Sequence, residues 1–198
     1  MKKFLIMLLT LVLAFAMTFS LVACDDTNKK DESEKEEPEE TTTETIPETT
    51  ESNEPVAIPE GYELYSDDVI SFAYPSTWHN NAGSLMHAGT GNNINVGYEE
   101  MSDFYSTMDV ASFNSELKPM LEQAGLTIKN PSVEQLTNDN DTKCTKIRFT
   151  TQYSGVTMTQ TMFIVAAGGY NYVITVTEVA ADDALIENVY KTLDIIEK

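Results

Sequence analysis

Basic residues are scarce in this chain of 198 residues. Lysine and arginine together number 12, against 32 aspartate and glutamate residues, so the formal net charge is −20. The phosphate backbone of a nucleic acid repels such a chain, and no stripe of basic residues interrupts the excess of acid. We therefore predict no nucleic-acid partner. The same repulsion opposes adhesion of the protein surface to anionic lipid headgroups, so attachment to a membrane needs a separate anchor.

Histidines and catalytic motifs are equally scarce. His79 and His87 are the only histidines, and so the only ordinary candidates for a general base at neutral pH. Neither lies in a nucleophile motif, and the chain has no Gly-Xaa-Ser-Xaa-Gly, no His-Glu-Xaa-Xaa-His and no phosphate-binding glycine loop. We predict that the protein is not an enzyme and carries no cofactor.

Cysteine occurs only twice, at Cys24 and Cys144. The charged neighbours of Cys144 in sequence are Lys143 and Lys146, and no histidine is close by to act as a base. A lone cysteine of this kind is typically a small buried apolar residue, and we interpret Cys144 as inert. If Cys24 is modified, no disulfide can form within the chain, and the fold must rest on its hydrophobic core.

The N-terminus has the order of regions found in a secretory signal. Lys2 and Lys3 are followed by the apolar run Phe4 to Phe19, which only threonines interrupt, and then by the small-residue segment Ser20 to Ala23. The alternative is an uncleaved membrane helix, but this run is at the short end of the roughly 17 to 25 residues that such a helix needs. We predict a signal peptide over residues 1–23, cleaved between Ala23 and Cys24.

The segment Leu21-Val22-Ala23-Cys24 resembles the lipobox of bacterial lipoprotein precursors. The resemblance implies that Cys24 carries lipid, palmitate included, and becomes the first residue of the mature protein. It places the protein at the cell membrane, lipid-anchored on the extracytoplasmic face. Two fatty chains hold such an anchor durably, because each buried methylene contributes about 0.8 kcal/mol.

Residues 24–60 have the composition of a disordered linker. They are rich in Glu, Thr, Ser and Pro, include the acidic run Glu36-Glu37-Pro38-Glu39-Glu40, and show no apolar periodicity. Such a segment buries too little surface to offset the entropy of ordering it. We predict an extended acidic stalk between the lipid and a globular domain over residues 61–198. Its threonine clusters leave O-glycosylation as a minority alternative.

The domain begins with short segments of alternating or β-branched residues and later shows a long antiparallel meander. Turn residues separate these segments, and tight glycine turns connect the last three. The predicted strands are Tyr62 to Tyr65, Val69 to Tyr74, Ser84 to His87, Asn93 to Glu99, Leu126 to Lys129, Val133 to Leu136, Lys143 to Tyr153, Val156 to Ala166 and Tyr170 to Glu178. His79, with Asn80 and Asn81, falls in a polar turn.

Two segments have the three- or four-residue apolar spacing of a helix. One follows the N-cap Asp109 and runs to Gly125, with Pro119 expected to kink the helix or split it near Lys118. The other follows Asp182 or Asp183 and closes the chain. Strands, a helix, a meander and a final helix predict an α+β fold, an antiparallel sheet flanked by helices in an α/β/α sandwich.

The segment Ile70-Ser71-Phe72-Ala73-Tyr74-Pro75, followed by Trp78, the meander and the terminal Ile195-Ile196, resembles the PsbP-like domains of bacterial lipoproteins. That fold is shared with the extrinsic photosystem subunit and with a nuclear-import factor that binds the Ran GTPase. The resemblance implies a non-catalytic protein-interaction or adaptor module, whose partner here is an envelope protein. It supplies no catalytic residues. We interpret Pro75 and Trp78 as structural, one ending a strand and the other filling the core.

The alternative function is a small-ligand or divalent-metal-binding lipoprotein. A ligand pocket could be lined by Tyr170, Tyr172 or Trp78, and the resemblance adds that some PsbP-like proteins are associated with divalent ions. Glu99, Glu100 and Asp103 could offer carboxylates to a hard cation. Residues 138–141, Asn-Asp-Asn-Asp, superficially resemble a calcium loop but lack its glycine and distal glutamate, so we predict a hairpin turn there.

Overall fold

The computed structural model describes residues 57–81, 84–153 and 155–196. The predicted signal peptide, the cleavage site at Ala23 and Cys24, and nearly all of the linker lie outside the described residues. In chain order the elements are β1 (Tyr62–Ser66), β2 (Ile70–Pro75), β3 (His79–Asn81), β4 (Ser84–Met86), β5 (Asn93–Glu100), α2 (Val110–Ser112), the π-helical turn η1 (Phe113–Leu117), α3 (Lys118–Gln123), β6 (Lys129–Thr137), β7 (Lys143–Tyr153), β8 (Val156–Ala167), β9 (Tyr170–Glu178), α4 (Asp183–Thr192) and β10 (Asp194–Ile195).

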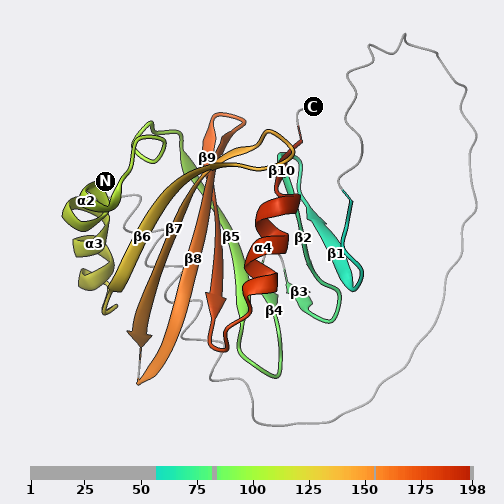
Figure 1. The fold of residues 1–198 in the computed structure, drawn as a ribbon, viewed down its shortest axis with the longest axis horizontal. Coiled ribbons are helices and arrows are strands. Elements are labelled where there is room, and N and C mark those ends of the chain that lie inside the picture. The colour runs from blue at the N-terminus through green and yellow to red at the C-terminus, as the bar shows by residue number, and fades with distance from the viewer. Residues whose placement is uncertain (1–56, 82–83, 154, 197–198) are drawn as a thin grey trace, which may run out of the picture.

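The strands form two antiparallel sheets (Figure 1). The large sheet has the order β3-β4-β5-β9-β8-β7-β6, and the small one has the order β1-β2-β10. The predicted meander is confirmed, because β7 pairs with β8 and β8 with β9 in continuous antiparallel register. Alternate residues of each strand point to opposite faces, so the large sheet offers two apolar faces to be covered.

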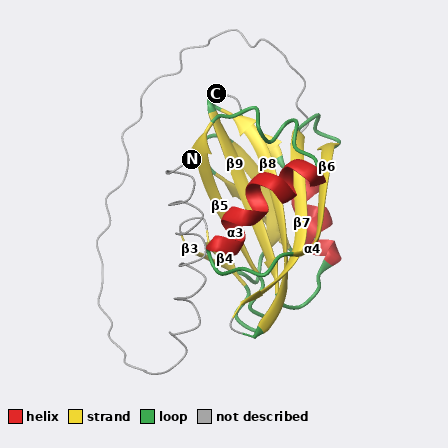
Figure 2. Ribbon diagram, turned by 90° about the vertical axis from the view of Figure 1, so that its left-hand side faces the viewer, coloured by secondary structure: helices red, strands yellow, loops and turns green. Residues whose placement is uncertain are grey.

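Each face of the large sheet has its own core. On one face, Phe163 of β8 and Ile174 of β9 pack with Phe72 of the small sheet and Leu185 of α4. On the other, Ile147 of β7 and Met162 of β8 pack with the residues that η1 and α3 bury; Figure 2 shows α3 lying across this face. The expected antiparallel sheet with helices is therefore confirmed. The sandwich was expected to have helices alone in its outer layers, but α4 shares its layer with the small sheet.

Helix α4 and strand β2, which lie in the same layer, are linked through a hydroxyl group. The Thr192 hydroxyl accepts a hydrogen bond from Ala73 N at 2.7 Å and donates one to Asn188 O at 2.6 Å. Strand β10 pairs with β2 only as far as Ser71. The Thr192 hydroxyl, at the end of α4, therefore supplies the acceptor that the Ala73 amide would otherwise lack. The small sheet is thereby held against the closing helix.

The first helical segment is split at Lys118, one of the two predicted outcomes, and the break is a π-helical turn. Lys118 N donates to Phe113 O, five residues back, and Pro119 then lies at the start of α3. A proline inside a regular helix clashes with the carbonyl four residues earlier, whereas at a first turn its missing N–H costs nothing. Asp109 is the N-cap as predicted, since its Oδ1 accepts from Ser112 N at 2.7 Å.

Two strand predictions were wrong. His79–Asn81, expected as a turn, is strand β3, because it pairs with β4. Leu126 to Ile128 are not a strand; instead Lys129–Thr137 form one strand that continues through Pro131, with a register shift between Lys129 and Ser132. Strand β6 is an edge strand, where a proline need not donate to a neighbour.

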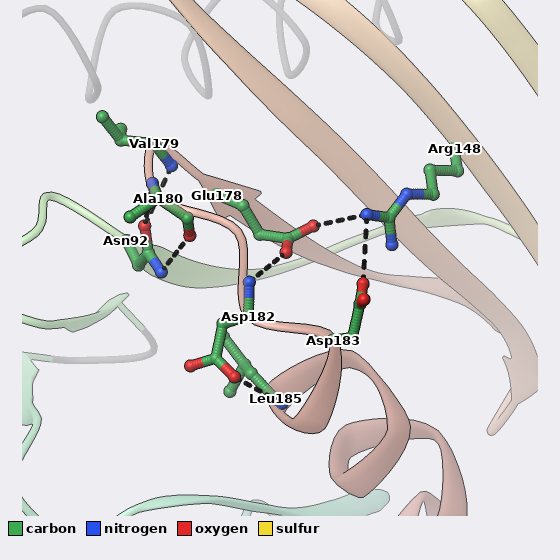
Figure 3. A network of polar contacts seen from close by, with 8 residues as sticks. All are labelled: Asn92, Arg148, Glu178, Val179, Ala180, Asp182, Asp183 and Leu185. Atoms are coloured by element: carbon green, nitrogen blue, oxygen red, sulfur yellow. Dashed lines mark hydrogen bonds and ion pairs between the residues drawn. The ribbon is translucent and has the colours of Figure 1, made fainter.

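A polar network closes the corner between β9 and α4 (Figure 3). Glu178, at the end of β9, accepts from Asp182 N at 2.8 Å through one oxygen and pairs with Arg148 through the other. Asn92 binds the same corner, since its Oδ1 accepts from Val179 N at 2.9 Å and Ala180 N at 3.0 Å. Asp182, one of the two caps that the sequence offered, then caps α4 through Leu185 N.

Candidate functional site

Three tyrosines gather at the opposite end of β9 from this corner. Tyr170 and Tyr172 lie on one face of β9, and Tyr98 lies on the same face of β5, directly opposite Tyr172. Side chains two residues apart on a strand, and those opposite each other on paired strands, are neighbours on one face. We call Tyr98, Tyr170 and Tyr172 the tyrosine cluster.

The rings of the tyrosine cluster contact one another in fixed orientations. Tyr98 and Tyr170 meet edge to face, with centroids 5.4 Å apart and planes inclined by 78°. Tyr98 and Tyr172 are 5.8 Å apart and inclined by 38°. Tyr172 is only 8% exposed and belongs to the core, whereas Tyr98 is 60% and Tyr170 43% exposed. The cluster is thus an exposed aromatic surface formed by Tyr98 and Tyr170, and the buried ring of Tyr172 connects it to the core.

The turn between β1 and β2 brings negative charge to the tyrosine cluster. Burial, followed by the charge of Asp67, raises the pKa of the Tyr172 hydroxyl, and Asp68 adds a smaller effect in the same direction. Burial and the Asp67 charge likewise raise the pKa of Tyr65. The Asp67 carboxylate is held in place because its Oδ1 accepts from Val69 N at 2.7 Å and Ile70 N at 2.8 Å.

A backbone hydrogen bond at Met101 fixes the strand ends that carry Tyr98 and Tyr170. Met101 directly follows β5, is 50% exposed, and donates through its backbone N to Gly169 O at 3.3 Å. That bond ties the end of β5 to the turn that precedes Tyr170. The turn has φ of +57° at Gly168 and +83° at Gly169, a backbone that glycine adopts without steric cost.

A cavity of about 590 Å³ lies near the same end of the large sheet. Its lining includes Asp103, Lys143, Thr145 and Asn171, and none of the three clustered tyrosines. Several of its polar groups already bind protein atoms. The Thr145 hydroxyl donates to Tyr105 O at 2.8 Å, and Asn171 Nδ2 donates to Ser102 O at 3.2 Å. These groups fix the loop after β5 and leave fewer donors for a ligand.

Sequence reasoning named two of the three clustered tyrosines. Tyr170 and Tyr172 come together as candidate ligand-contacting residues, whereas Trp78 is buried in the core and does not join them. The interpretation of Trp78 as a core residue is therefore confirmed. The sequence prediction did not include Tyr98. Its signal was present, since Tyr98 continues the alternation of Ile94 and Val96 on the face of the sheet that also carries Tyr172.

The two histidines do not form a catalytic arrangement. His87 Nδ1 accepts from Gly89 N at 3.1 Å and Thr90 N at 3.0 Å, so this nitrogen organises the turn before β5. The His87 ring also meets the core residue Trp78 edge to face, at 6.1 Å. His79 is exposed on β3. The positions of both side chains fit structural or surface roles.

The candidate carboxylates for a cation are not brought together. Glu99 and Glu100 are consecutive on β5 and so point to opposite faces. Glu99 hydrogen-bonds with Tyr105, and burial raises the pKa of the Glu99 carboxyl. Across residues 57–81, 84–153 and 155–196, no three His, Cys, Asp or Glu side chains are grouped to hold a metal ion.

The Asn138 segment is a hairpin turn, as predicted. Asn138 Oδ1 accepts from Asn140 N and Thr142 N, both at 3.0 Å, and so stabilises the turn. Its Nδ2 donates to Leu193 O at 2.6 Å and Tyr190 O at 2.9 Å. The residue therefore links the β6–β7 turn to the end of α4.

Cys144 is 4% exposed and packs in the core that α4 covers, which confirms the interpretation of a buried thiol. Burial raises the pKa of this thiol to about 11, with a smaller opposing effect from Lys146. The thiolate, which is the nucleophilic form, is therefore scarce at neutral pH.

No helix in the described part of the chain is long and apolar enough to cross a membrane. Cys24, the predicted lipidation site, lies outside those residues.

Comparison with known proteins identifies the fold. No family model matches the chain, and no curated protein matches it. Among solved structures, the solution structure of cyanobacterial PsbP (CyanoP) from Synechocystis aligns with a TM-score of 0.50 and 13% identity, covering 73% of this chain and 97% of that one. A crystal structure from Bacteroides thetaiotaomicron aligns with a TM-score of 0.39 and 18% identity, over 65% of this chain and 46% of that one. The described domain has a PsbP-like fold.

Proposed function

We propose that this protein is a lipoprotein of the extracytoplasmic face of the cell membrane, anchored through Cys24, whose PsbP-like domain is a non-catalytic protein-interaction module. The observation that carries the interaction role is the tyrosine cluster, with Tyr98 60% exposed and Tyr170 43% exposed while their rings stay in contact. The partner is a protein of the cell envelope.

The tyrosine cluster has the physical properties of a protein-binding surface. Tyrosine is enriched among the few interface residues that contribute most binding energy, because a large rigid ring loses little conformational entropy on binding. Here the two exposed rings hold each other, and Tyr172 anchors them in the core. The ordering cost of association is therefore low.

A site-specific photocrosslinker tests this role. Benzoylphenylalanine at position 98, in intact cells, is expected to trap a defined envelope protein. The control is the same group at Val110, which is 39% exposed on the short helix α2 and lies outside the tyrosine cluster. A discrete adduct from position 98 alone supports the proposal. No adduct from position 98, or identical adducts from both positions, argues against it.

The anchor rests on the order of charged, apolar and small residues before Cys24. Metabolic labelling with a palmitate analogue is expected to label the protein, and Cys24→Ala is expected to abolish the label. Cys144→Ala is the matched control, because it removes the other cysteine and should leave labelling intact. Label that survives Cys24→Ala contradicts the anchor.

Small-ligand binding stays the second candidate, because the cavity volume of about 590 Å³ lies in the range of known ligand pockets. A ligand bound there would raise the unfolding temperature of the full chain. Ala166 lines the cavity, so Ala166→Trp is expected to fill it and abolish that rise. A calcium titration by calorimetry tests the metal alternative, and the absence of heat discards it.

A further inference from the structure

We propose that the tyrosine cluster binds a basic, arginine-containing segment of the partner protein. This inference rests on the proposed function and specifies the chemistry of the partner. It draws on three properties of the site: the ring geometry, the neighbouring charge and the lack of an enclosing cavity.

The ring geometry leaves π surface available to a cation. In the edge-to-face contact of Tyr98 and Tyr170, inclined by 78°, one ring covers only part of the other, and both stay well exposed. A guanidinium group within about 6 Å of a tyrosine face is attracted by the ring quadrupole. Arginine suits such a site better than lysine, because its planar group also stacks on the ring and is more weakly hydrated.

The charge around the cluster attracts the same partner. Asp67 and Asp68 lie close enough to Tyr172 to act on its hydroxyl. In the described ranges, 18 carboxylates stand against 6 basic side chains. Four of those six, Lys118, Lys146, Arg148 and Lys191, pair with carboxylates of α3, β6, β9 and α4. The surface is therefore complementary to a cationic segment.

Two other occupants fit less well. A second copy of the chain would bring a formal charge of −20 against another −20. A small molecule needs a concave site, and the cavity near this end of the sheet is lined by none of the clustered tyrosines. A sugar could stack on one ring, but edge-to-face rings do not form the flat platform that several sugar units would share.

The test measures fluorescence anisotropy of a labelled peptide of alternating glycine and arginine, with the full chain in non-ionic detergent. Tyr98→Ala/Tyr170→Ala is expected to weaken binding about 5- to 30-fold, the effect of two exposed cation–π contacts. These substitutions leave the net charge unchanged, so attraction of the peptide to acidic residues elsewhere is the same in both proteins. Tyr98→Phe/Tyr170→Phe keeps the rings and is expected to bind within about 2-fold of the wild type.

A charge-matched pair tests the acidic neighbours. Asp67→Asn/Asp68→Asn is expected to weaken binding more than Glu116→Gln/Asp139→Asn, which removes two carboxylates from η1 and the β6–β7 turn. The Asp67→Asn change retains a side-chain oxygen that can accept from Val69 N and Ile70 N, so the β1–β2 turn should persist.

The inference would be overturned by no binding of the arginine peptide by the wild type, by equal binding by the Tyr→Ala variant, or by equal losses in the two charge variants. If position 98 still crosslinks to a partner while one of these results is found, the interaction role stands. Only the proposal that the partner segment is basic is then rejected. Binding of an oligosaccharide at the tyrosines, without the peptide, also overturns it.

Discussion

Arg148 Nη2 lies 3.2 Å from Oε2 of Glu178, a carboxylate whose side chain is 1% exposed. Arg148 is the only arginine of the chain. It also lies 3.7 Å from Asp183 Oδ1, on the first turn of α4 (Figure 3). One cation thus joins the middle of β7 to the end of β9 and the start of α4.

Arg148→Met is expected to destabilise the fold by about 3 kcal/mol, because it leaves the Glu178 carboxylate buried without its counter-charge. This is the low end of the range for buried pairs, since the Arg148 side chain is 31% exposed. Urea unfolding measures the change. Adding Glu178→Gln should recover most of the loss, because the amide oxygen can still accept from Asp182 N.

The matched control is Lys146→Met, on the same strand and face. Lys146 pairs with Glu134 at 3.4 Å, but the Glu134 side chain is half exposed. Its loss should cost less than about 1 kcal/mol. Equal costs for the two substitutions would show that burial of Glu178 does not govern this corner.

Asn138→Ala is expected to cost about 2 to 3 kcal/mol, because it leaves buried backbone groups of the β6–β7 turn and of α4 without partners. Asn140→Ala is the comparison, since its longer bonds to Lys191 O at 3.2 Å and Leu193 O at 3.3 Å are more exposed. The thermal unfolding midpoint of Asn138→Ala should lie well below that of Asn140→Ala. The reverse order would contradict the role assigned to Asn138.

Gly169→Ala is expected to cost about 1 to 2 kcal/mol through backbone conformation alone. At φ +83° an L-residue is strained, yet no atom lies within 4 Å of the added methyl group. Gly169→Asn should cost less, because asparagine tolerates positive φ. Denaturant unfolding checks the order, and equal costs for Ala and Asn would indicate that the methyl group clashes after all.

The Cys144 thiol is expected to make stability fall as pH rises from about 9 to about 11. Its folded pKa of about 11 is above the ordinary value of 9.0, so burial favours the protonated form. That contribution is fully present below the unfolded pKa and is lost as pH rises through the folded pKa. The unfolding free energy of Cys144→Ala should therefore decline less over this interval than that of the wild type.

Thiol labelling gives an independent measure of the same group. The folded protein, with Cys24 blocked by lipid or replaced by alanine, should react slowly with iodoacetamide at pH 7 and faster as pH approaches 11. Rapid reaction at pH 7 would contradict a buried, protonated Cys144.

Local patterns in the sequence were sufficient for much of the secondary structure. The β7–β8–β9 meander could be predicted because apolar and polar residues alternate along its strands and its turns contain glycine. Both signals depend only on residues close together in the sequence. The helix caps at Asp109 and Asp182 could be proposed because a cap bonds to a backbone N–H only three residues further along the chain. Strand β3 was missed because His79–Asn81 has no apolar alternation and is a strand only through its pairing with β4.

The sequence by itself determined the acidic character of this protein, its antiparallel α+β plan and the interpretation of Cys144 and Trp78 as core residues, since these depend on composition and short-range spacing. Only the tertiary structure decided which tyrosines meet. Tyr98 and Tyr170 are far apart in the chain, and the register of β5 against β9 brings their rings to 5.4 Å. The β1–β2 turn then places Asp67 beside them, a juxtaposition that depends on long-range pairing and packing.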